Sequence, residues 1–233
     1  MLSTLTILPF TAIPVLAAAA GALLVAWRPP GEKTQGFVQH FAAGVVFAAA
    51  AAELLPDVMH RQSLTAALIG AALGVALMLA IRSVGRKLKG GFGLTAVIAI
   101  DVLVDGLVVG LSFVQGTRQG ILLTIALTIE LLFLALTVAS ELGGAGMSKL
   151  LVAGTTIGLS LLLPPGAALG FGVLGGLADP IVTGLYAFGL VALLYLVTEE
   201  LLVEAHEKPD TPLATAVFFV GFFLMVMLDK LIG

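Results

Sequence analysis

The sequence predicts an all-α membrane protein with eight transmembrane helices, and its composition is the first reason. Hydrophobic residues make up 60% of the 233-residue chain, only 11% of residues are charged, and the mean hydropathy is +1.16. Soluble domains carry roughly 25% charged residues because their surfaces face water. Apolar runs of about 20 residues, the length that crosses a bilayer core, recur along the whole chain. The surface therefore faces lipid, and a soluble protein with an oversized core is disfavoured.

Charge and cysteine content exclude several functions. The net charge is −3, so no basic face is present to bind nucleic acid. The chain has no cysteine, which excludes disulfides and thiolate metal sites. No nucleophile–base pair, phosphate loop or cofactor motif stands out, so we do not expect an enzyme. The chain starts without a basic region, and its first apolar run is too long for a signal-peptide core, so we interpret it as a membrane span.

Charged and Pro/Gly-rich clusters divide the chain into eight apolar segments within a single transmembrane domain. The separators are residues 28–33, 60–62, 86–91 and 207–210. Pro164 and Pro165 predict a break or kink inside the sixth segment. The segments run approximately over residues 4–27, 36–58, 63–85, 92–115, 119–141, 148–177, 182–205 and 212–232.

The distribution of basic residues predicts the orientation. With the N-terminus outside, eight of the 11 lysines and arginines fall on the inner side. Basic residues favour the cytoplasmic side, so we expect both termini outside. The compact chain is typical of a bacterial inner membrane.

Two segments end in similar acidic pairs. The second ends with Glu53 and Asp57, and the seventh with Glu200 and Glu204. Because four spans, an even number, lie between them, the two segments cross the bilayer in opposite directions. Inverted repeats of this kind are a recurring plan of transporters. The orientation above places the first pair near the outer face and the second near the inner face.

Three acidic residues lie in the middle of apolar segments. They are Asp101 and Asp105 in the fourth segment and Glu130 in the fifth. Each carboxylate at the bilayer centre opposes insertion by about 2.5 to 3.5 kcal/mol. No lysine or arginine lies at comparable depth. The missing counter-charge is therefore a bound cation or protons.

Spacing predicts that the three carboxylates share one site. Asp101 and Asp105 are one helical turn apart and face the same way. A short connection makes segments four and five antiparallel neighbours, which brings Glu130 to a similar depth. Thr128 supplies a further oxygen, and Gly106 with Gly110 allows another helix to approach closely.

Plainer interpretations stay open for these groups. Carboxylates inside the bundle can also be protonated and hydrogen-bonded between helices. Glu53, Asp57, Glu199, Glu200 and Glu204 lie within about a turn of the interface, where solvated helix ends are common. His40, His60 and His206 also lie near helix ends, where a single histidine is more often an ordinary surface residue than a ligand.

Four segments together resemble the ZIP family of zinc and iron permeases over most of the chain. Residues 41–57 end in Glu-Leu-Leu-Pro-Asp, like the second helix of that family, and residues 194–206 resemble its penultimate helix. Residues 164–170 resemble its Glu-Pro-Leu-Gly-Ala motif, and residues 221–229 fit its last helix. The resemblance implies a 3+2+3 arrangement, in which helices 1–3 and 6–8 form an inverted repeat around helices 4 and 5.

The resemblance also implies a transport site between the fourth and fifth helices. The family's fourth helix reads His-Asn-x-Pro-Glu-Gly. Matched to this motif, Asp101 stands at the His position and Asp105 at the Glu position before Gly106, while Val102 and Val104 replace the Asn and the Pro. The histidine ligands and the helix-kinking proline are therefore missing here.

The fifth and sixth helices depart from the family pattern as well. In the fifth, Thr128 takes the His position and Glu130 falls between the two usual ligand positions. In the sixth, Leu163 stands where the family has its Glu. The fold carries over from the resemblance, but zinc does not carry over automatically.

The function hypothesis is transport of a divalent cation as substrate. The expected ligands are Asp101, Asp105, Glu130 and Thr128. Carboxylates favour Mn²⁺, Fe²⁺ or Mg²⁺, and zinc also accepts them. The ion enters past Glu53 and Asp57, and it leaves through a pathway that contains the following residues: Glu199, Glu200, Glu204 and His206.

Two rival functions stay open. The chain is either a proton-coupled transporter of another solute that has lost metal transport, or a non-transporting membrane scaffold. We expect the lipid bilayer and the metal ion as partners, exclude nucleic acid, and keep a homodimer open.

Overall fold

The structure, a computed structural model, describes residues 4–87, 91–144, 146–174, 177–208 and 211–232. Residues 88–90 of the predicted separator at 86–91, and residues 209–210 of the one at 207–210, lie outside these ranges. Within them the regular secondary structure is helical, and eight helical stretches are long and apolar enough to cross a membrane. The prediction of an all-α fold with eight spans is confirmed, and the chain is a multi-pass membrane protein.

Five of the spans are uninterrupted α-helices. They are α1 (Thr4–Trp27), α4 (Leu64–Lys87), α5 (Gly91–Gln115), α6 (Thr117–Gly144) and α11 (Pro212–Ile232). Only Gly116 separates α5 from α6. The two helices therefore run antiparallel side by side, as the short connection predicts.

The sixth span is broken at its proline pair. Its first part, α7 (Lys149–Ser160), begins with the Ser148 hydroxyl accepting from the amide of Leu151, and its second part is α8 (Leu163–Leu174). Pro164 and Pro165 occupy the first turn of α8, where a missing amide proton removes no helical hydrogen bond. The expected break therefore lies directly before the prolines.

The second and seventh spans each contain a π-helical turn. In the second, η1 (Ala50–Leu54) joins α2 (Glu32–Ala49) to α3 (Leu55–His60). In the seventh, η2 (Val197–Leu201) joins α9 (Asp179–Leu196) to α10 (Leu202–His206). Glu53 and Glu200 are each the fourth residue of their turn, so the two spans repeat a local geometry as well as an acidic pair. Such turns are frequent at functional sites.

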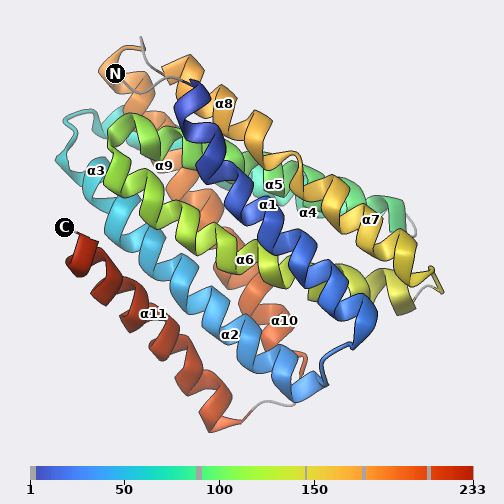
Figure 1. The fold of residues 1–233 in the computed structure, drawn as a ribbon. Helices are drawn as coiled ribbons and strands as arrows, with labels where there is room; N and C mark the ends of the chain where they lie inside the picture. Colours follow the sequence, from blue (N-terminus) through green and yellow to red (C-terminus); the bar gives the residue numbers. More distant parts are fainter. Residues whose placement is uncertain (1–3, 88–90, 145, 175–176, 209–210, 233) are drawn as a thin grey trace.

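The alternation of the spans defines two ends of the molecule. Both termini lie at one end, here called the terminal end, together with the ends of α3, α5 and α8 (Figure 1). The opposite end, the distal end, holds the start of α2, the end of α10 and the start of α11. The chain passes between these ends eight times, so the position of a residue along its span gives its depth between the two ends.

Glycines allow a close helix contact between α5 and α8. A Cβ atom on Gly106 would lie 2.2 Å from the carbonyl oxygen of Leu163, and one on Gly110 would lie 2.2 Å from that of Ala167. The contact is mutual, since a Cβ on Gly166 would lie 2.3 Å from the carbonyl oxygen of Leu103. The predicted close approach at Gly106 and Gly110 is confirmed. Small residues let backbones meet where lipid gives no hydrophobic drive between helices.

The main helix pairs form two groups. In the first group, α1 packs along α6 and α5 packs along α8, with α7 beside α1. In the second group, α2 packs along α11 and α4 along α9. The two groups meet where α2 touches α6 and where α4 and α9 touch α5. The acidic residues of α5 and α6 thus belong to the first group, and the acidic pairs of the repeated spans belong to the second.

Candidate metal centre

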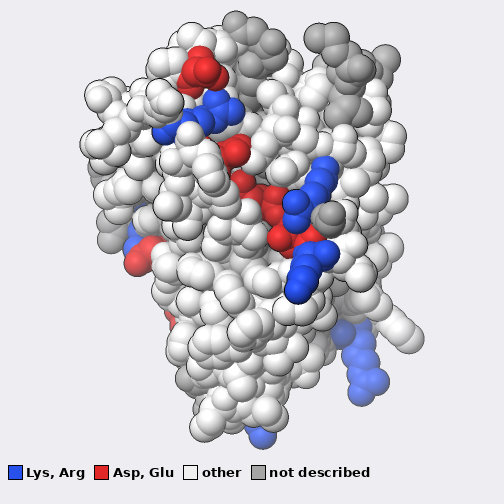
Figure 2. All heavy atoms as spheres, turned by 90° about the vertical axis from the view of Figure 1, so that its left-hand side faces the viewer, with Lys and Arg blue, Asp and Glu red and all other residues white. Residues whose placement is uncertain are grey.

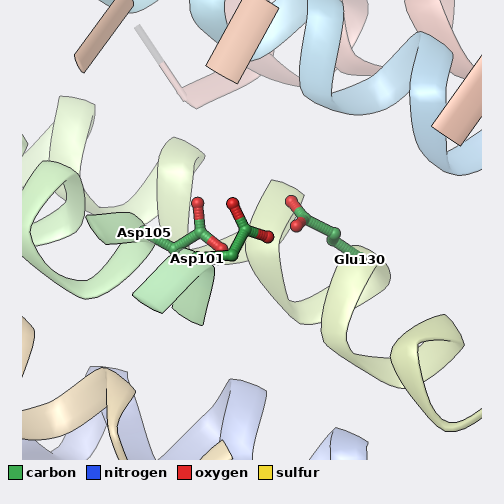
Figure 3. A group of neighbouring side chains, drawn as sticks. All are labelled: Asp101, Asp105 and Glu130. Atoms are coloured by element: carbon green, nitrogen blue, oxygen red, sulfur yellow. The ribbon is translucent and has the colours of Figure 1, made fainter. Parts of the chain in front are cut away.

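Three carboxylates meet between α5 and α6. Asp101 and Asp105 project from one face of α5, and Glu130 projects toward them from α6 (Figure 3). One oxygen atom of each residue lies within 4.8 Å of the other two. Asp105 is 2% exposed and Glu130 is 7% exposed, while Asp101 is half-buried. The structure therefore brings together the three acids that the sequence singled out.

Among the described residues, no lysine, arginine or histidine forms an ion pair with these carboxylates. The ion pairs found among the described residues join Arg61 to Asp179, Arg82 to Glu199 and Arg118 to Asp229. Oδ2 of Asp105 and Oε2 of Glu130 are buried and receive no hydrogen bond. Leaving a buried polar atom unpaired costs free energy, and a charged one costs more. The arrangement suits a visiting positive ligand, either a cation or protons.

A cavity leads from the carboxylates toward the distal end. Its volume is about 240 Å³. A water molecule occupies about 30 Å³ in the liquid, so the cavity has room for a partly hydrated cation. Seven polar side chains lie along its wall: Gln39, Asp101, Glu130, Thr137, Glu199, Glu200 and Glu204.

Neighbouring side chains hold the acids along this cavity. Oε2 of Glu204 accepts hydrogen bonds of 2.7 Å from Nε2 of Gln39 and from the hydroxyl of Thr137. Glu199 pairs with Arg82 of α4. Gln39 and Thr137 were missed from the sequence. The sequence could have indicated Thr137, because it lies two turns after Glu130 on the same face of α6. No sequence pattern distinguishes Gln39.

The terminal end is held together by polar contacts between the two groups of helices. Arg118 pairs with the side chain of Asp229 and also donates to its main-chain oxygen at 3.1 Å. The Tyr186 hydroxyl donates to the main-chain oxygen of Leu111 at 3.1 Å. Gln115 donates to that of Glu53 at 3.4 Å. These contacts fasten α5 and α6 to the second group at this end.

The predicted entry residues, Glu53 and Asp57, lie at the terminal end. Glu53 is 4% exposed, and Asp57 is half-buried with one unpaired carboxylate oxygen. Neither residue lines the 240 Å³ cavity. The structure therefore separates the two predicted acidic pairs, with Glu53 and Asp57 toward the terminal end and Glu200 and Glu204 on the cavity wall.

Two predicted site residues do not join the carboxylates. The Thr128 hydroxyl donates to the carbonyl of Thr124 in its own helix, and Thr128 does not line the cavity. Residues two apart in a helix point to nearly opposite faces, so Thr128 faces away from Glu130. His206 is exposed and is not on the cavity wall either. The position of Thr128 therefore does not suit a ligand of the carboxylate centre.

Charge is unevenly distributed on the surface. Figure 2 shows one face on which acidic side chains gather in a band with basic side chains beside them, while most of that face is uncharged. The ion pairs of Arg61 with Asp179 and of Arg82 with Glu199 connect neighbouring spans. The uncharged remainder is what a lipid-facing surface requires.

Fold and site together define a multi-pass membrane protein with a buried acidic centre beside a cavity that extends toward the distal end. No family model matches the chain. It is similar to the Zinc transporter ZIPB of Bordetella bronchiseptica, with 31% identity over 139 residues, or 58% of this chain. The chain covers 44% of that protein, which is less than half of the relative's length. This similarity supports the resemblance to the ZIP family.

Proposed function

We propose that the chain is a divergent ZIP-type transporter that moves a divalent metal cation through the carboxylate centre between α5 and α6. The observation that carries the proposal is the convergence of Asp101, Asp105 and Glu130 within 4.8 Å in a lipid-facing fold, without a basic partner among the described residues. The similar protein from Bordetella bronchiseptica is named a zinc transporter. The role of this chain is transport of an ion and not catalysis.

The ligand atoms define the class of ion. Three carboxylates offer hard oxygen ligands and up to three negative charges, which suit Mn²⁺ and Fe²⁺. Zinc also accepts carboxylate oxygens at about 2.0 to 2.2 Å. The substrate is therefore a dication of the zinc, iron and manganese class, held by Asp101, Asp105 and Glu130. No part of the proposal uses a second copy of the chain.

The proposed route runs from the terminal end to the distal end. The ion enters past Glu53 and Asp57, stops at the three carboxylates, and leaves past Glu199, Glu200 and Glu204. The positive-inside rule supports an outer position for the terminal end, and the distal cavity then faces the cell interior. Entry requires the polar contacts at the terminal end, such as Arg118 with Asp229, to separate.

An inverted repeat supports alternating access. In the 3+2+3 arrangement, the repeat exchanges spans 1–3 with spans 6–8, and span 4 with span 5. Helices α1 and α6 are spans 1 and 5, so the exchange converts this pair into spans 6 and 4, which are α8 and α5. The same exchange converts α2–α11 into the pair α9–α4. Both members of each exchange are main packing pairs of the fold. The matched π-turns also agree with this repeat, and transporters of this kind bind substrate between their repeats.

Metal uptake into liposomes tests the proposed function. We expect Asp105→Asn to lower uptake of Zn²⁺ or Mn²⁺ by at least about tenfold, because it removes a buried anionic ligand. Asp179→Asn is the matched control, since Asp179 has a 95% exposed side chain at the terminal end. We expect the control to transport normally. Equal uptake by Asp105→Asn and the unmodified protein would contradict the proposal.

A further inference from the structure

Two histidines from different spans lie side by side at the distal end. His40 belongs to α2 and His206 is the last residue of α10. Their ring centroids are 5.1 Å apart, and the ring planes meet at 63°. The neighbouring residues Gln39 and Glu204 are hydrogen-bonded on the wall of the cavity. The histidine pair therefore lies along the same contact between α2 and α10, beside the carboxylate pathway.

The ring of His40 has one nitrogen atom without a partner. Nδ1 lies 2.8 Å from the carbonyl oxygen of Gly36, and a carbonyl only accepts hydrogen bonds. Nδ1 therefore carries the proton, and in the neutral ring Nε2 carries a lone pair. His40 is 1% exposed, and its Nε2 atom is buried without a hydrogen-bond partner. A buried acceptor in this state is costly unless a ligand satisfies it.

His206 is oriented in the same manner. Its Nδ1 atom lies 2.5 Å from the carbonyl oxygen of Leu202, four residues earlier in the helix. Metal-binding histidines commonly donate one ring N–H to a backbone carbonyl, which fixes the ring and directs the other nitrogen to the metal. His60 also contacts the carbonyl of Pro56, so this contact alone marks no site. Among the three histidines, the pair at the distal end combines this contact with a second ring nearby and with the buried, unpaired Nε2 atom of His40.

The separation of the rings fits one bridging metal ion. Metal–nitrogen bonds of about 2.0 to 2.1 Å are usual for zinc, and a ring nitrogen lies about 1.1 Å from the centre of its ring. Two imidazoles that bind one ion at the tetrahedral angle therefore have ring centroids about 5 Å apart. The observed distance is 5.1 Å. We propose that His40 and His206 form a second metal site, separate from the carboxylate centre, that binds a dication such as Zn²⁺, Co²⁺ or Ni²⁺.

The chemistry of this site differs from that of the carboxylate centre. Imidazole nitrogens suit zinc, nickel and copper, whereas manganese and magnesium prefer oxygen ligands. Two protein ligands leave the other coordination positions to water, so the ion exchanges easily. Such a site is suited to an ion that has just left the cavity. This role as an exit station rests on the proposed transport function, whereas metal binding by the pair does not.

Cobalt binding tests the site in a protein that lacks the carboxylate centre. The background variant is Asp105→Asn with Glu130→Gln, purified as the full chain without a polyhistidine tag. Co²⁺ is titrated and followed by its visible absorption, and Zn²⁺ and Mn²⁺ are added as competitors. We expect one bound Co²⁺ that Zn²⁺ displaces and Mn²⁺ does not. A background variant that binds no Co²⁺ would overturn the proposal.

Single histidine variants in that background assign the ligands. We expect His40→Gln and His206→Gln each to weaken Co²⁺ binding by at least about tenfold, and His60→Gln to leave it unchanged. His206 is exposed, so its variant keeps the test valid if the buried His40→Gln protein fails to fold. Co²⁺ affinity that is unchanged in His206→Gln would refute the site. Because uptake by Asp105→Asn in the otherwise unmodified chain tests the transport function, the two proposals can fail independently.

Discussion

Asp105 and Glu130 are costly to bury in this protein. Both are more than nine-tenths buried, and each has a carboxylate oxygen without a hydrogen-bond donor. In a lipid-facing bundle such residues are expensive and mark ion or proton pathways. A dication satisfies all three carboxylates at once, whereas protons satisfy each one separately. Thermal stability therefore distinguishes a metal carrier from a proton carrier.

Metal ions should raise the melting temperature of the purified protein. A ligand that binds only the folded state stabilises it by about 2.7 kcal/mol at a concentration of 100 times its Kd. We expect Zn²⁺ or Mn²⁺ to produce such a shift, and Glu130→Gln to reduce it. A protein that responds to pH alone would be a proton carrier, and one that responds to neither would be a scaffold.

The contact between α5 and α8 shows how the helices hold the site in place. Gly106 follows Asp105 directly, and its Cα faces the backbone of α8 so closely that no side chain fits between the helices. Because small residues are the main means of tight packing in lipid, this contact is expected to hold α5 against α8. A substitution that adds a single methyl group at this contact tests its effect on stability.

Gly106→Ala should destabilise the protein. The new Cβ would lie 2.2 Å from the carbonyl oxygen of Leu163, and overpacking of this kind costs about 1 to 3 kcal/mol. Gly158→Ala in α7 is the matched control, because nothing lies within 4 Å of a Cβ at that position. We expect a lower melting temperature for Gly106→Ala only. Equal melting temperatures would show that the contact does not restrain α5.

The sequence predicts some features of the elements well and others poorly. The spans are predictable because a bilayer core demands long apolar runs, and the carboxylate centre is predictable because Asp101, Asp105 and Glu130 interrupt such runs. The π-turns are not, because no sequence pattern marks the extra residue of each turn, and the residues that flank the turns are ordinary helical ones. Gln39 and the pairing of His40 with His206 depend on how α2 meets α10, which no local pattern in the chain encodes.

At the scale of the whole molecule, the cavity and the polar contacts between the two groups of helices lie toward opposite ends. The cavity connects the carboxylates with the distal end, while Arg118, Gln115 and Tyr186 join the two groups of helices at the terminal end. Since basic residues concentrate toward the distal end, the positive-inside rule predicts that this end faces the cytoplasm. The sequence contains no cysteine, so single cysteines can report the orientation directly.

Cysteine labelling should establish the topology. We expect a membrane-impermeant maleimide to label Gln62→Cys, at the terminal end, in intact cells. Glu207→Cys, at the distal end, should react only after the membrane is permeabilised. Both residues are exposed, so accessibility within the protein does not limit the reaction. The reverse pattern would place both termini in the cytoplasm.

The most direct test of the central claim is to locate the ion. The measurement is an anomalous-scattering map of crystals of the full chain grown with Zn²⁺ or Mn²⁺. We expect a peak between the carboxylates of Asp101, Asp105 and Glu130, at about 2.0 to 2.2 Å from their oxygens for zinc, and no such peak in Asp105→Asn. A map of metal-loaded protein without density between these three side chains would contradict the account.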